Sequence, residues 1–347
     1  MATIEGKSAG EAGRSGDERP TLKTIAYMTG LGVTTVSRAL RDAPDIGQAT
    51  KERVRLVADQ IGYRPNRAGV RLRTGKTNVI SLTLSIEEEV MGLTPSLVFG
   101  LSERLTDTPY HLVVTPYSLS NDPLDPVRYV VETGGADGII LSRTQPDDPR
   151  VRYLIDRKFP FVTHGRTDMG FEHDYFDFDN DEFGYRAAQH LIAKGRNHLA
   201  LLPPPMTLTY GHHMTAGFSR AVAEADVLDI PIRTITVDDP MSVIEAEITR
   251  MMAGRHRPDG LVCGSGAATI AATAGIEAAG LTIGKDIDLV GKQSIDILGR
   301  FRPAISRFNE DVREAGRQLA DALVARIADP DAPPRQNLMA ASYEPEV

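Results

Sequence analysis

Hydrophobic positions between residues 21 and 65 follow a helical period in three short segments. Thr21 can cap a first helix with apolar residues on one side, and the same spacing returns over Val33–Arg41 and Gln48–Ile61. Gly30-Leu31-Gly32 places a tight turn between the first two segments. A helix, a glycine-containing turn and a second helix make up the helix-turn-helix pattern. We therefore expect residues 21–65 to form a small helical head.

The segments that flank this head are too polar to build a core. Residues 1–20 are rich in Gly, Ser and charge, a composition that predicts a disordered tail. Residues 66–77 follow the helix-breaking Pro65 and predict a hinge or linker with a weak helix that reaches Leu72. Gly69 weakens that helix further.

From residue 78 to residue 347, short apolar runs alternate with amphipathic stretches. The expected strands are Val79–Leu84, His111–Thr115, Gly138–Ser142, Phe161–His164, Leu199–Leu202, Ile232–Val237, Gly260–Cys263 and Ile287–Val290. The expected helices are Pro95–Thr106, Asp125–Glu132, Asp181–Lys194, Met214–Ala225, Val243–Met252, Ala267–Ala279 and Asp311–Ile327. Repeated β-α-β order predicts parallel sheets covered by helices. We expect an α/β fold with two doubly wound parallel-sheet lobes, and a ligand cleft between them at the carboxyl ends of the strands.

Charge separates the head from this body. The whole chain carries a net charge of -8, but residues 21–78 carry +7 and residues 79–347 carry -14. A small basic module on an acidic body indicates a polyanion partner for the module alone. Chance clustering of surface charge is the alternative.

Several function classes lack their signatures. No apolar run approaches the ~18 residues of a membrane span, and the N-terminus has no apolar signal core, so we expect a cytoplasmic protein. The single cysteine, Cys263, excludes an intramolecular disulfide framework. No His/Cys/Asp cluster has zinc-ligand spacing, and neither a Gly-x-Ser-x-Gly elbow nor a Walker loop is present. We therefore expect neither an enzyme nor a metal or other cofactor.

The second helix of the head has the side chains of a DNA-reading helix. In a helix-turn-helix domain this helix enters the major groove and its N-terminal residues contact base edges. Val33 can meet a thymine methyl, Thr34 can donate or accept, and Arg38 can fork onto a guanine. Thr35 and Ser37 suit phosphate oxygens. A helical bundle without a DNA function is the alternative.

The chain resembles the LacI/GalR family of transcriptional regulators, the family of the lactose repressor. The head carries the resemblance without gaps in Thr21-Leu22-Lys23-Thr24-Ile25-Ala26, Thr35-Val36-Ser37-Arg38-Ala39-Leu40, Gly62-Tyr63-Arg64-Pro65-Asn66 and Leu72-Arg73-Thr74-Gly75-Lys76-Thr77. In the body it is clearest in Val131–Leu141, Phe178-Asp179-Asn180-Asp181, His190-Leu191, Ala216-Gly217-Phe218, Gly275–Gly280 and Asp286–Gly291. The resemblance implies a periplasmic-binding-protein-like body and a ligand-responsive regulator, expected to be a repressor that joins the nucleoid when bound to DNA.

The resemblance also implies how DNA is bound. Paired hinges fold in the minor groove and a leucine, here Leu72, wedges into the central base step and kinks the duplex. Two hinges at one operator centre require a homodimer and a two-fold operator. Gly32 and Gly47 stand where the family commonly has serine helix caps, a modest loss. The DNA-binding residues we expect are Thr21, Leu22, Val33, Thr34, Thr35, Ser37, Arg38, Tyr63, Asn66, Arg67 and Leu72.

The chain departs from the family's sugar-reading positions. It has Gly165-Arg166 where an Asp is common, Met214 where an Arg is common, and Lys292-Gln293 in place of an aromatic residue and an Asp. Gly264-Ser265-Gly266 resembles a glycine-rich turn that presents N–H groups at a helix N-terminus. We hypothesise an anionic effector such as a sugar phosphate or sugar acid. A neutral sugar, or no tight ligand, is the alternative. The expected effector residues are Ser85, Ser118, Ser142, Arg166, Tyr210, His212, Met214, Gly264, Ser265, Lys292 and Gln293.

Two rival interpretations remain. In the first, a sugar-binding protein uses a basic head only to dimerise, but such a head needs neither Val33-Thr34 with Arg38 nor Leu72. The alternating Asp177, Asp179 and Asp181 resemble calcium ligands, yet they lack the Gly and distal Glu of an EF-hand, and a structural turn fits them better. Whether an effector releases or tightens DNA stays open, because one architecture serves both.

Overall fold

The computed structural model describes residues 20–64, 71, 75–85 and 93–344. The chain divides into two compact units, Met1–Thr77 and Asn78–Val347, and each is described by itself. The hinge residues Asn66, Arg67 and Leu72, which the sequence analysis singled out, lie outside the described residues.

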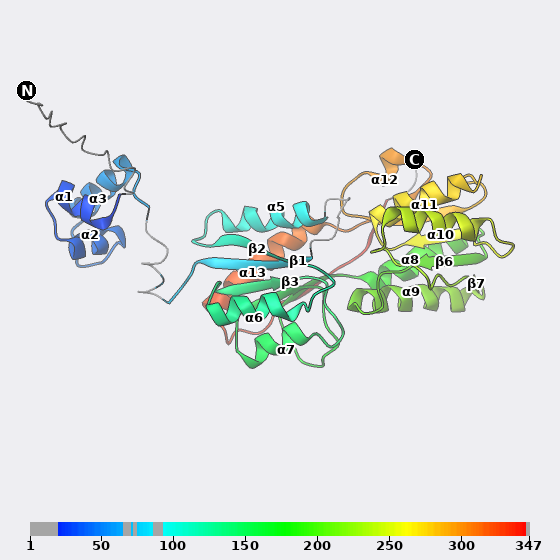
Figure 1. The fold of residues 1–347 in the computed structure, drawn as a ribbon, viewed down its shortest axis with the longest axis horizontal. Coiled ribbons are helices and arrows are strands. Elements are labelled where there is room, and N and C mark those ends of the chain that lie inside the picture. The colour runs from blue at the N-terminus through cyan, green and yellow to red at the C-terminus, as the bar shows by residue number, and fades with distance from the viewer. Residues whose placement is uncertain (1–19, 65–70, 72–74, 86–92, 345–347) are drawn as a thin grey trace, which may run out of the picture. The chain divides into compact units, whose positions relative to one another are not determined.

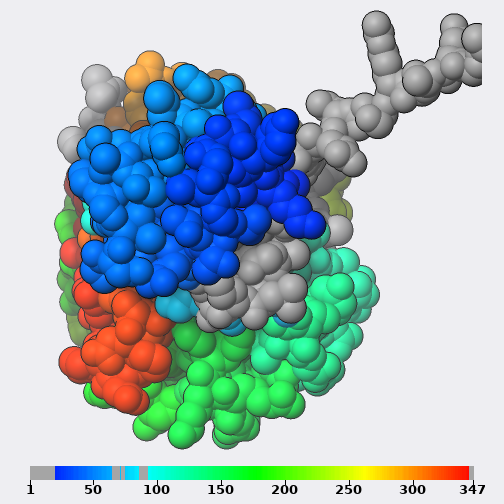
Figure 2. Space-filling model, turned by 90° about the vertical axis from the view of Figure 1, so that its left-hand side faces the viewer, coloured from blue at the N-terminus to red at the C-terminus, as the bar shows by residue number. Residues whose placement is uncertain are grey.

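The head consists of α1 (Leu22–Thr29), α2 (Val33–Leu40) and α3 (Gln48–Gln60). Thr21 caps α1 through a reciprocal pair of hydrogen bonds with Thr24, and Gly30 ends it in the left-handed conformation at φ 67°. Apolar side chains from all three helices form the core, which comprises Ile25, Ala26, Val36, Ala39, Val54 and Ala58. In the space-filling view these blue segments make one continuous body (Figure 2). The three helices expected from the sequence are confirmed.

The first lobe is a six-stranded, all-parallel sheet. Its strands are β1 (Val79–Ser85), β2 (His111–Tyr117), β3 (Gly138–Leu141), β4 (Phe161–His164), β5 (Tyr175–Phe178) and β11 (Gln336–Met339). Their order is β11-β5-β4-β3-β1-β2, so β2 is an edge strand. Two helices cover each face, α5 (Leu93–Leu105) with α13 (Val312–Ala328) on one and α6 (Leu124–Thr133) with α7 (Pro149–Asp156) on the other (Figure 1).

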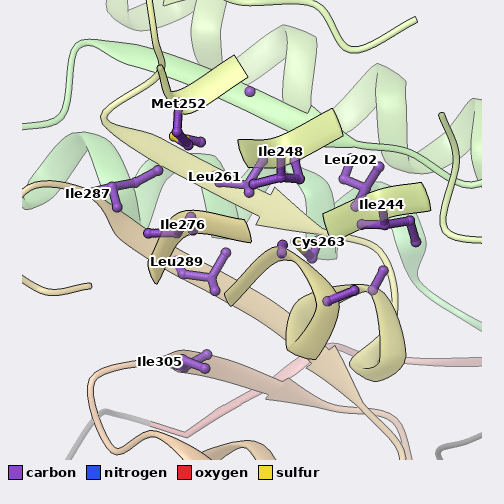
Figure 3. Close-up of a cluster of buried hydrophobic side chains, with 14 of the residues drawn as sticks. Leu202, Ile244, Ile248, Met252, Leu261, Cys263, Ile276, Ile287, Leu289 and Ile305 are labelled. Carbon is purple, nitrogen blue, oxygen red and sulfur yellow. The ribbon is translucent and has the colours of Figure 1, made fainter. Parts of the chain in front are cut away.

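The second lobe repeats this plan with one antiparallel edge strand, β12. Its strands are β6 (His198–Leu202), β7 (Leu228–Asp229), β8 (Gly260–Cys263), β9 (Asp288–Gln293), β10 (Ser306–Asn309) and β12 (Ser342–Glu344), in the order β12-β10-β9-β8-β6-β7. Its helices are α8 (Asn180–Ala193), α9 (Thr209–Ala225), α10 (Met241–Met252), α11 (Gly266–Ala278) and the short α12 (Leu298–Phe301). Figure 3 shows the aliphatic core of this lobe, to which α10, β8 and β9 contribute Ile248, Leu261 and Leu289.

The chain crosses between the lobes three times: from β5 to α8, from β10 to α13, and from β11 to β12. Because β5 and β10 leave their sheets at their carboxyl ends and enter the other lobe, these ends of the two sheets face each other. The strand orders put the crossings beside β5, β11, β10 and β12, so β2, β1, β6 and β7 lie on the far side. The expected cleft between the two lobes therefore has two sides. The three crossings lie on one of them, called the hinge side below, and the opposite side, at β2, β1, β6 and β7, is called the mouth.

Two expected elements were wrong. The segment Ile232–Val237 is not a strand. Pro231 just before it has no N–H to donate to a neighbouring strand, and the alternating apolar side chains of the segment pack against the core from a coil. Helix α9 begins at Thr209 rather than at Met214, so Tyr210 and His212 lie on a helix and not in a loop. Strands β5, β7, β10, β11 and β12 were missed, since each is short and mixes polar with apolar residues.

Candidate nucleic-acid interface and effector cleft

One face of α2 carries the side chains expected to read DNA. Val36 and Ala39 are fully buried, whereas Val33 is 41% exposed and Thr34 and Arg38 are exposed as well. Thr34 and Arg38, four residues apart, lie on the same side of the helix, and Val33 adjoins Thr34 in the first turn. The structure thus brings the expected base-contacting side chains to one surface. Thr35 and Ser37, expected at phosphates, are half-buried beside them.

Arg38 is held by a carboxylate in the isolated head. Its guanidinium forms an ion pair with Asp45 in the loop that follows α2, and both side chains are about half exposed. The same loop is tied to α3 by Asp42, which accepts from Arg55 at 2.9 Å and pairs with Lys51 at 3.2 Å. Lys51 and Arg55 hold the pKa of Asp42 below its ordinary value. The Arg38 side chain is therefore engaged by Asp45 in this arrangement of the head.

The other described residues of the expected interface support the head itself. The Thr21 hydroxyl is used as the cap of α1, although the residue is exposed. Leu22 and Tyr63 are half-buried against the core, and burial raises the pKa of Tyr63. Gly32 caps α2 without a side-chain bond, as expected from its lack of a hydroxyl.

The two lobes touch across the cleft. The backbone N–H of Thr209, at the start of α9, donates to the Thr144 carbonyl at 2.9 Å, and its hydroxyl donates to the same oxygen at 3.2 Å. Arg166 after β4 lies 3.4 Å from the His213 ring nitrogen on α9. These contacts join the two lobes across the cleft.

Lys292 at the end of β9 is neutralised on the hinge side. Its ammonium lies 2.7 Å from the Glu310 carboxylate and donates to the Asn180 amide oxygen at 3.2 Å, so it links two of the three interlobe crossings. It also stands 5.0 Å from the centre of the Phe178 ring and 5.6 Å from that of Tyr210. Burial opposes ionisation of Glu310, yet Lys292 keeps the pKa of this carboxyl below its ordinary value.

Arg166 is neutralised too. Its Nε lies 3.0 Å from a carboxylate oxygen of buried Asp177, on β5. Burial raises the pKa of Asp177 to about 7, although Arg166 acts in the opposite direction. His164 lies on the same side of the cleft, with its Nε2 3.7 Å from a carboxylate oxygen of Glu310, and burial lowers the pKa of its imidazole. The two cations that motivated the anionic-effector hypothesis are thus already paired with carboxylates.

Four other expected effector residues have roles inside the second lobe. Met214 is fully buried in the core between α9 and the sheet, so it presents no surface to a ligand. Gln293 is buried, donates to Asn309 and accepts from the start of α12. A Cβ on Gly264 would lie 3.0 Å from the Met214 sulfur, so close packing accounts for this glycine. Ser265 caps α11 through a hydrogen bond from Ala268.

The remaining expected residues surround the cleft without converging on one point. Ser85, Ser118 and Ser142 stand at the carboxyl ends of β1, β2 and β3, as expected. Ser142 is buried and its hydroxyl donates to Thr83 at 3.5 Å. Tyr210 packs behind Lys292, while exposed His212 lies 2.5 Å from the Met206 carbonyl.

A pocket of about 390 Å³ opens at the mouth of the cleft. Its walls come from the ends of β2 and β3 in the first lobe and from the loops after β6 and β7 in the second. They comprise Tyr117, Leu119, Asn121, Pro123, Arg143, Gln145, Arg150, Pro205, Thr207, Leu208, Thr236, Asp238 and Asp239. As far as the described chain defines this pocket, its lining includes no effector residue expected from the sequence. Ser118 and Ser142 are direct neighbours in sequence of the lining residues Tyr117 and Arg143.

The acidic triplet that resembled calcium ligands serves three separate partners. Asp177 faces Arg166, Asp179 caps α8 by accepting from the Glu182 N–H, and Asp181 pairs with Arg220. The expected structural turn at Asp179 is confirmed. Among the residues with described positions, none group in threes to hold a metal ion. Their helices also include none long and apolar enough to span a membrane.

Asp177→Asn should change how stability depends on pH. Because the pKa of Asp177 rises from 3.8 to about 7 on folding, folding takes up a proton in this range and the stabilisation is lost as pH rises towards 7. The free energy of unfolding of the wild type, relative to the variant, should fall between about pH 4 and pH 7, by at most ~1.4 kcal/mol per pH unit. Urea denaturation of both proteins at each pH measures it. A difference that stays constant with pH would mean that Arg166 keeps Asp177 charged throughout.

Comparisons with known proteins agree with this architecture. Residues 21–66 match the model of bacterial regulatory proteins of the lacI family, and residues 188–345 match a periplasmic binding protein-like domain. The HTH-type transcriptional regulator AglR of Rhizobium meliloti is 32% identical over 340 residues, which cover 92% of this chain and 91% of AglR. RafR of Escherichia coli is 35% identical over 221 residues, 62% of this chain and 65% of RafR.

Solved structures share the fold. The lac repressor dimer bound to operator and an anti-inducer superposes with a TM-score of 0.82 at 19% identity, over 94% of this chain and 98% of that one. A complex of the regulator CelR with cellobiose gives 0.68 at 23% identity with the same coverage. The length and identity of the AglR match, together with the helix-turn-helix head and the two-lobed body, show that the chain belongs to the LacI family of bacterial transcriptional regulators.

Proposed function

We propose that this protein is a dimeric repressor that binds a two-fold operator through its heads, and that a neutral saccharide in the interlobe cleft controls operator affinity. The observation that carries the effector assignment is the pocket at the mouth of the cleft, which both lobes build from polar and apolar side chains. The DNA assignment rests on the exposed face of α2 and on the family.

An exposed apolar surface on the first lobe supports dimerisation. Edge strand β2 leaves one row of backbone groups without a neighbouring strand among the described residues, and Val113 and Val114 on it are 43% and 46% exposed. Phe99 on α5, whose helix packs beside β2, is 64% exposed. Edge strands with apolar side chains favour pairing with another chain. A second copy of this chain is the partner that a two-fold operator requires.

The charges of the pocket favour a neutral ligand. Arg143 and Arg150 are balanced in the lining by Asp238 and Asp239, and Asp148 also pairs with Arg150. Leucine and proline side chains complete the wall. Saccharides combine hydroxyl groups with apolar ring faces, which this mixture suits. Structural neighbours include complexes of CelR with cellobiose and of an Enterococcus faecium regulator with ribose.

An anionic effector would face a less favourable site. Lys292 and Arg166, the cations expected to receive it, are both paired with buried carboxylates. A phosphate or carboxylate would have to displace Glu310 or Asp177 and leave that charge buried without its partner, which is costly.

Isothermal titration calorimetry with the full-length protein tests the effector class. We expect at least one neutral oligosaccharide from cellobiose, maltose and raffinose to bind, and glucose 6-phosphate and gluconate to give no heat above dilution. Binding of the charged compounds alone would overturn the neutral-saccharide assignment and restore the anionic one. If none of these compounds gives heat of binding, the saccharide assignment is wrong.

A further inference from the structure

The mouth of the cleft contains one ion pair that joins the two lobes. Arg143 follows β3 in the first lobe, and its guanidinium lies 2.5 Å from the carboxylate of Asp238, which follows β7 in the second. Both side chains line the pocket and are only about a quarter exposed. The three chain crossings lie on the opposite side of the two sheets. The pair therefore sits where opening of the lobes would separate it most.

The backbone of Arg143 is held in an unusual conformation that fixes this geometry. Its φ is 55°, in the left-handed region that non-glycine residues rarely occupy. Its carbonyl accepts a hydrogen bond from Arg150 at 2.9 Å. Arg150 is in turn clamped by two hydrogen bonds to the carboxylate of Asp148, at 3.0 and 2.7 Å, and both side chains are buried. A buried charge pair thus supports the strained turn that directs Arg143 across the cleft.

Arg150 also has a donor without an acceptor at the pocket. Its side chain is 1% exposed and lines the pocket, yet Nη1 has no hydrogen-bond partner within the described part of the chain. Burial opposes the charge of Arg150, but Asp148 and, more weakly, Tyr117 hold its pKa above the ordinary value. A buried donor left without an acceptor is costly, and a ligand oxygen in the pocket would remove that cost.

We propose that Arg143, Arg150 and Asp238 form a hydroxyl-recognising subsite for the saccharide, with Arg143 and Asp238 exchanging part of their mutual pair for hydroxyls of one bound sugar. This inference rests on the proposed function and names the residues that determine its specificity. Arg143 and the free Nη1 of Arg150 donate to hydroxyl oxygens, and Asp238 accepts from hydroxyl hydrogens. Because the two acting residues belong to different lobes, the sugar favours the closed arrangement.

Calorimetry on matched variants tests this subsite. Arg143→Asn removes the guanidinium while keeping a residue that tolerates left-handed backbone, and Asp238→Asn removes the carboxylate charge. Each should weaken saccharide binding by about 10- to 100-fold, the range for hydrogen bonds to charged groups. Arg150→Lys keeps a cation beside Asp148 but lacks the second donor nitrogen, and it should weaken binding as well. Arg152→Asn on the same helix, whose exposed pair with Asp147 lies outside the pocket lining, should bind like the wild type.

The swap variant Arg143→Asp with Asp238→Arg separates recognition from lobe closure. It retains an interlobe ion pair but reverses donor and acceptor, so we expect closure by small-angle scattering without tight saccharide binding. Full saccharide affinity in the swap, or in both single Asn variants, would overturn the subsite. Thermal melting confirms that each variant is folded, and Asp238→Asn, which keeps the size and shape of the side chain, provides the comparison if another variant fails to fold. If the wild type itself binds no saccharide, the proposed function fails first and the subsite falls with it.

Discussion

Replacing Lys292 with methionine is expected to lower the free energy of unfolding of the two-lobed body by roughly 3–5 kcal/mol. The substitution leaves Glu310 buried without its cation, since the two charges lie 2.7 Å apart and the Glu310 side chain is 7% exposed. Attraction between the pair offsets the loss of hydration in the wild type, and nothing replaces it in the variant. Urea denaturation at pH 8 measures the change.

Two controls show whether the unpaired charge is the cause. The double substitution Lys292→Met with Glu310→Met removes both charges and should recover most of the lost stability, because replacing a buried pair by apolar residues is often neutral. Arg300→Ala breaks a highly exposed pair with Asp296 and should have no measurable effect.

His164 lies 3.7 Å from Glu310, and Lys292 helps to lower the pKa of His164. In Lys292→Met its pKa should therefore rise, so the defect should shrink below pH 6 in the same titration. A single variant as stable as the wild type at pH 8 would contradict the buried pair.

Arg38→Ala is expected to weaken operator binding by about 5- to 150-fold, the equivalent of the ~1–3 kcal/mol that a bidentate contact to guanine contributes. The operator would be a duplex selected from a random-sequence pool by the wild-type protein. Arg38 projects from the exposed face of α2 beside Val33 and Thr34, so it is well placed to reach a base edge. Fluorescence anisotropy at one fixed salt concentration measures the loss, because phosphate contacts make affinity strongly dependent on salt.

Asp45→Asn is the matched control for this prediction. It removes the carboxylate that holds Arg38 in the free head, so affinity should stay the same or increase. If Arg38 contacts a base, Arg38→Ala should also weaken binding to non-specific duplexes less than binding to the operator. An equal loss on operator and on random duplexes would instead make Arg38 a phosphate contact.

Local pattern was sufficient to predict most helices and most strands, but α7 and α12 were missed. The helical period predicted all three helices of the head to within about one residue. Apolar residues recur at helical spacing on the buried face of each helix, among them Ile25, Val36 and Val54. Interior strands such as β3 and β8 were recognised because both of their faces are buried and their residues are almost all apolar. The interior strands β5 and β10 were missed, because each mixes polar with apolar residues. Strand β11 and edge strand β12 were missed as well, because Gln336–Met339 and Ser342–Glu344 carry no comparable apolar run.

The cleft was predicted in outline, but its chemistry was not. Strand ends gave the correct side of the sheets, which is why Ser118 and Ser142 adjoin the pocket. The sequence did not show which charged side chains pair with each other. Lys292 lies on β9 and Glu310 follows β10, so the two meet only once the chain is folded. The left-handed turn at Arg143 is also invisible to residue patterns, since no glycine marks it.

The most direct test of the account is operator affinity measured by anisotropy while a saccharide is added at fixed salt. We predict that the full-length protein binds the selected operator, and that at least one of cellobiose, maltose and raffinose shifts its Kd, whereas glucose 6-phosphate and gluconate do not. The direction of the shift also shows whether the effector releases or tightens DNA. Failure to select any duplex, or an operator affinity that responds only to the charged compounds, would contradict the account.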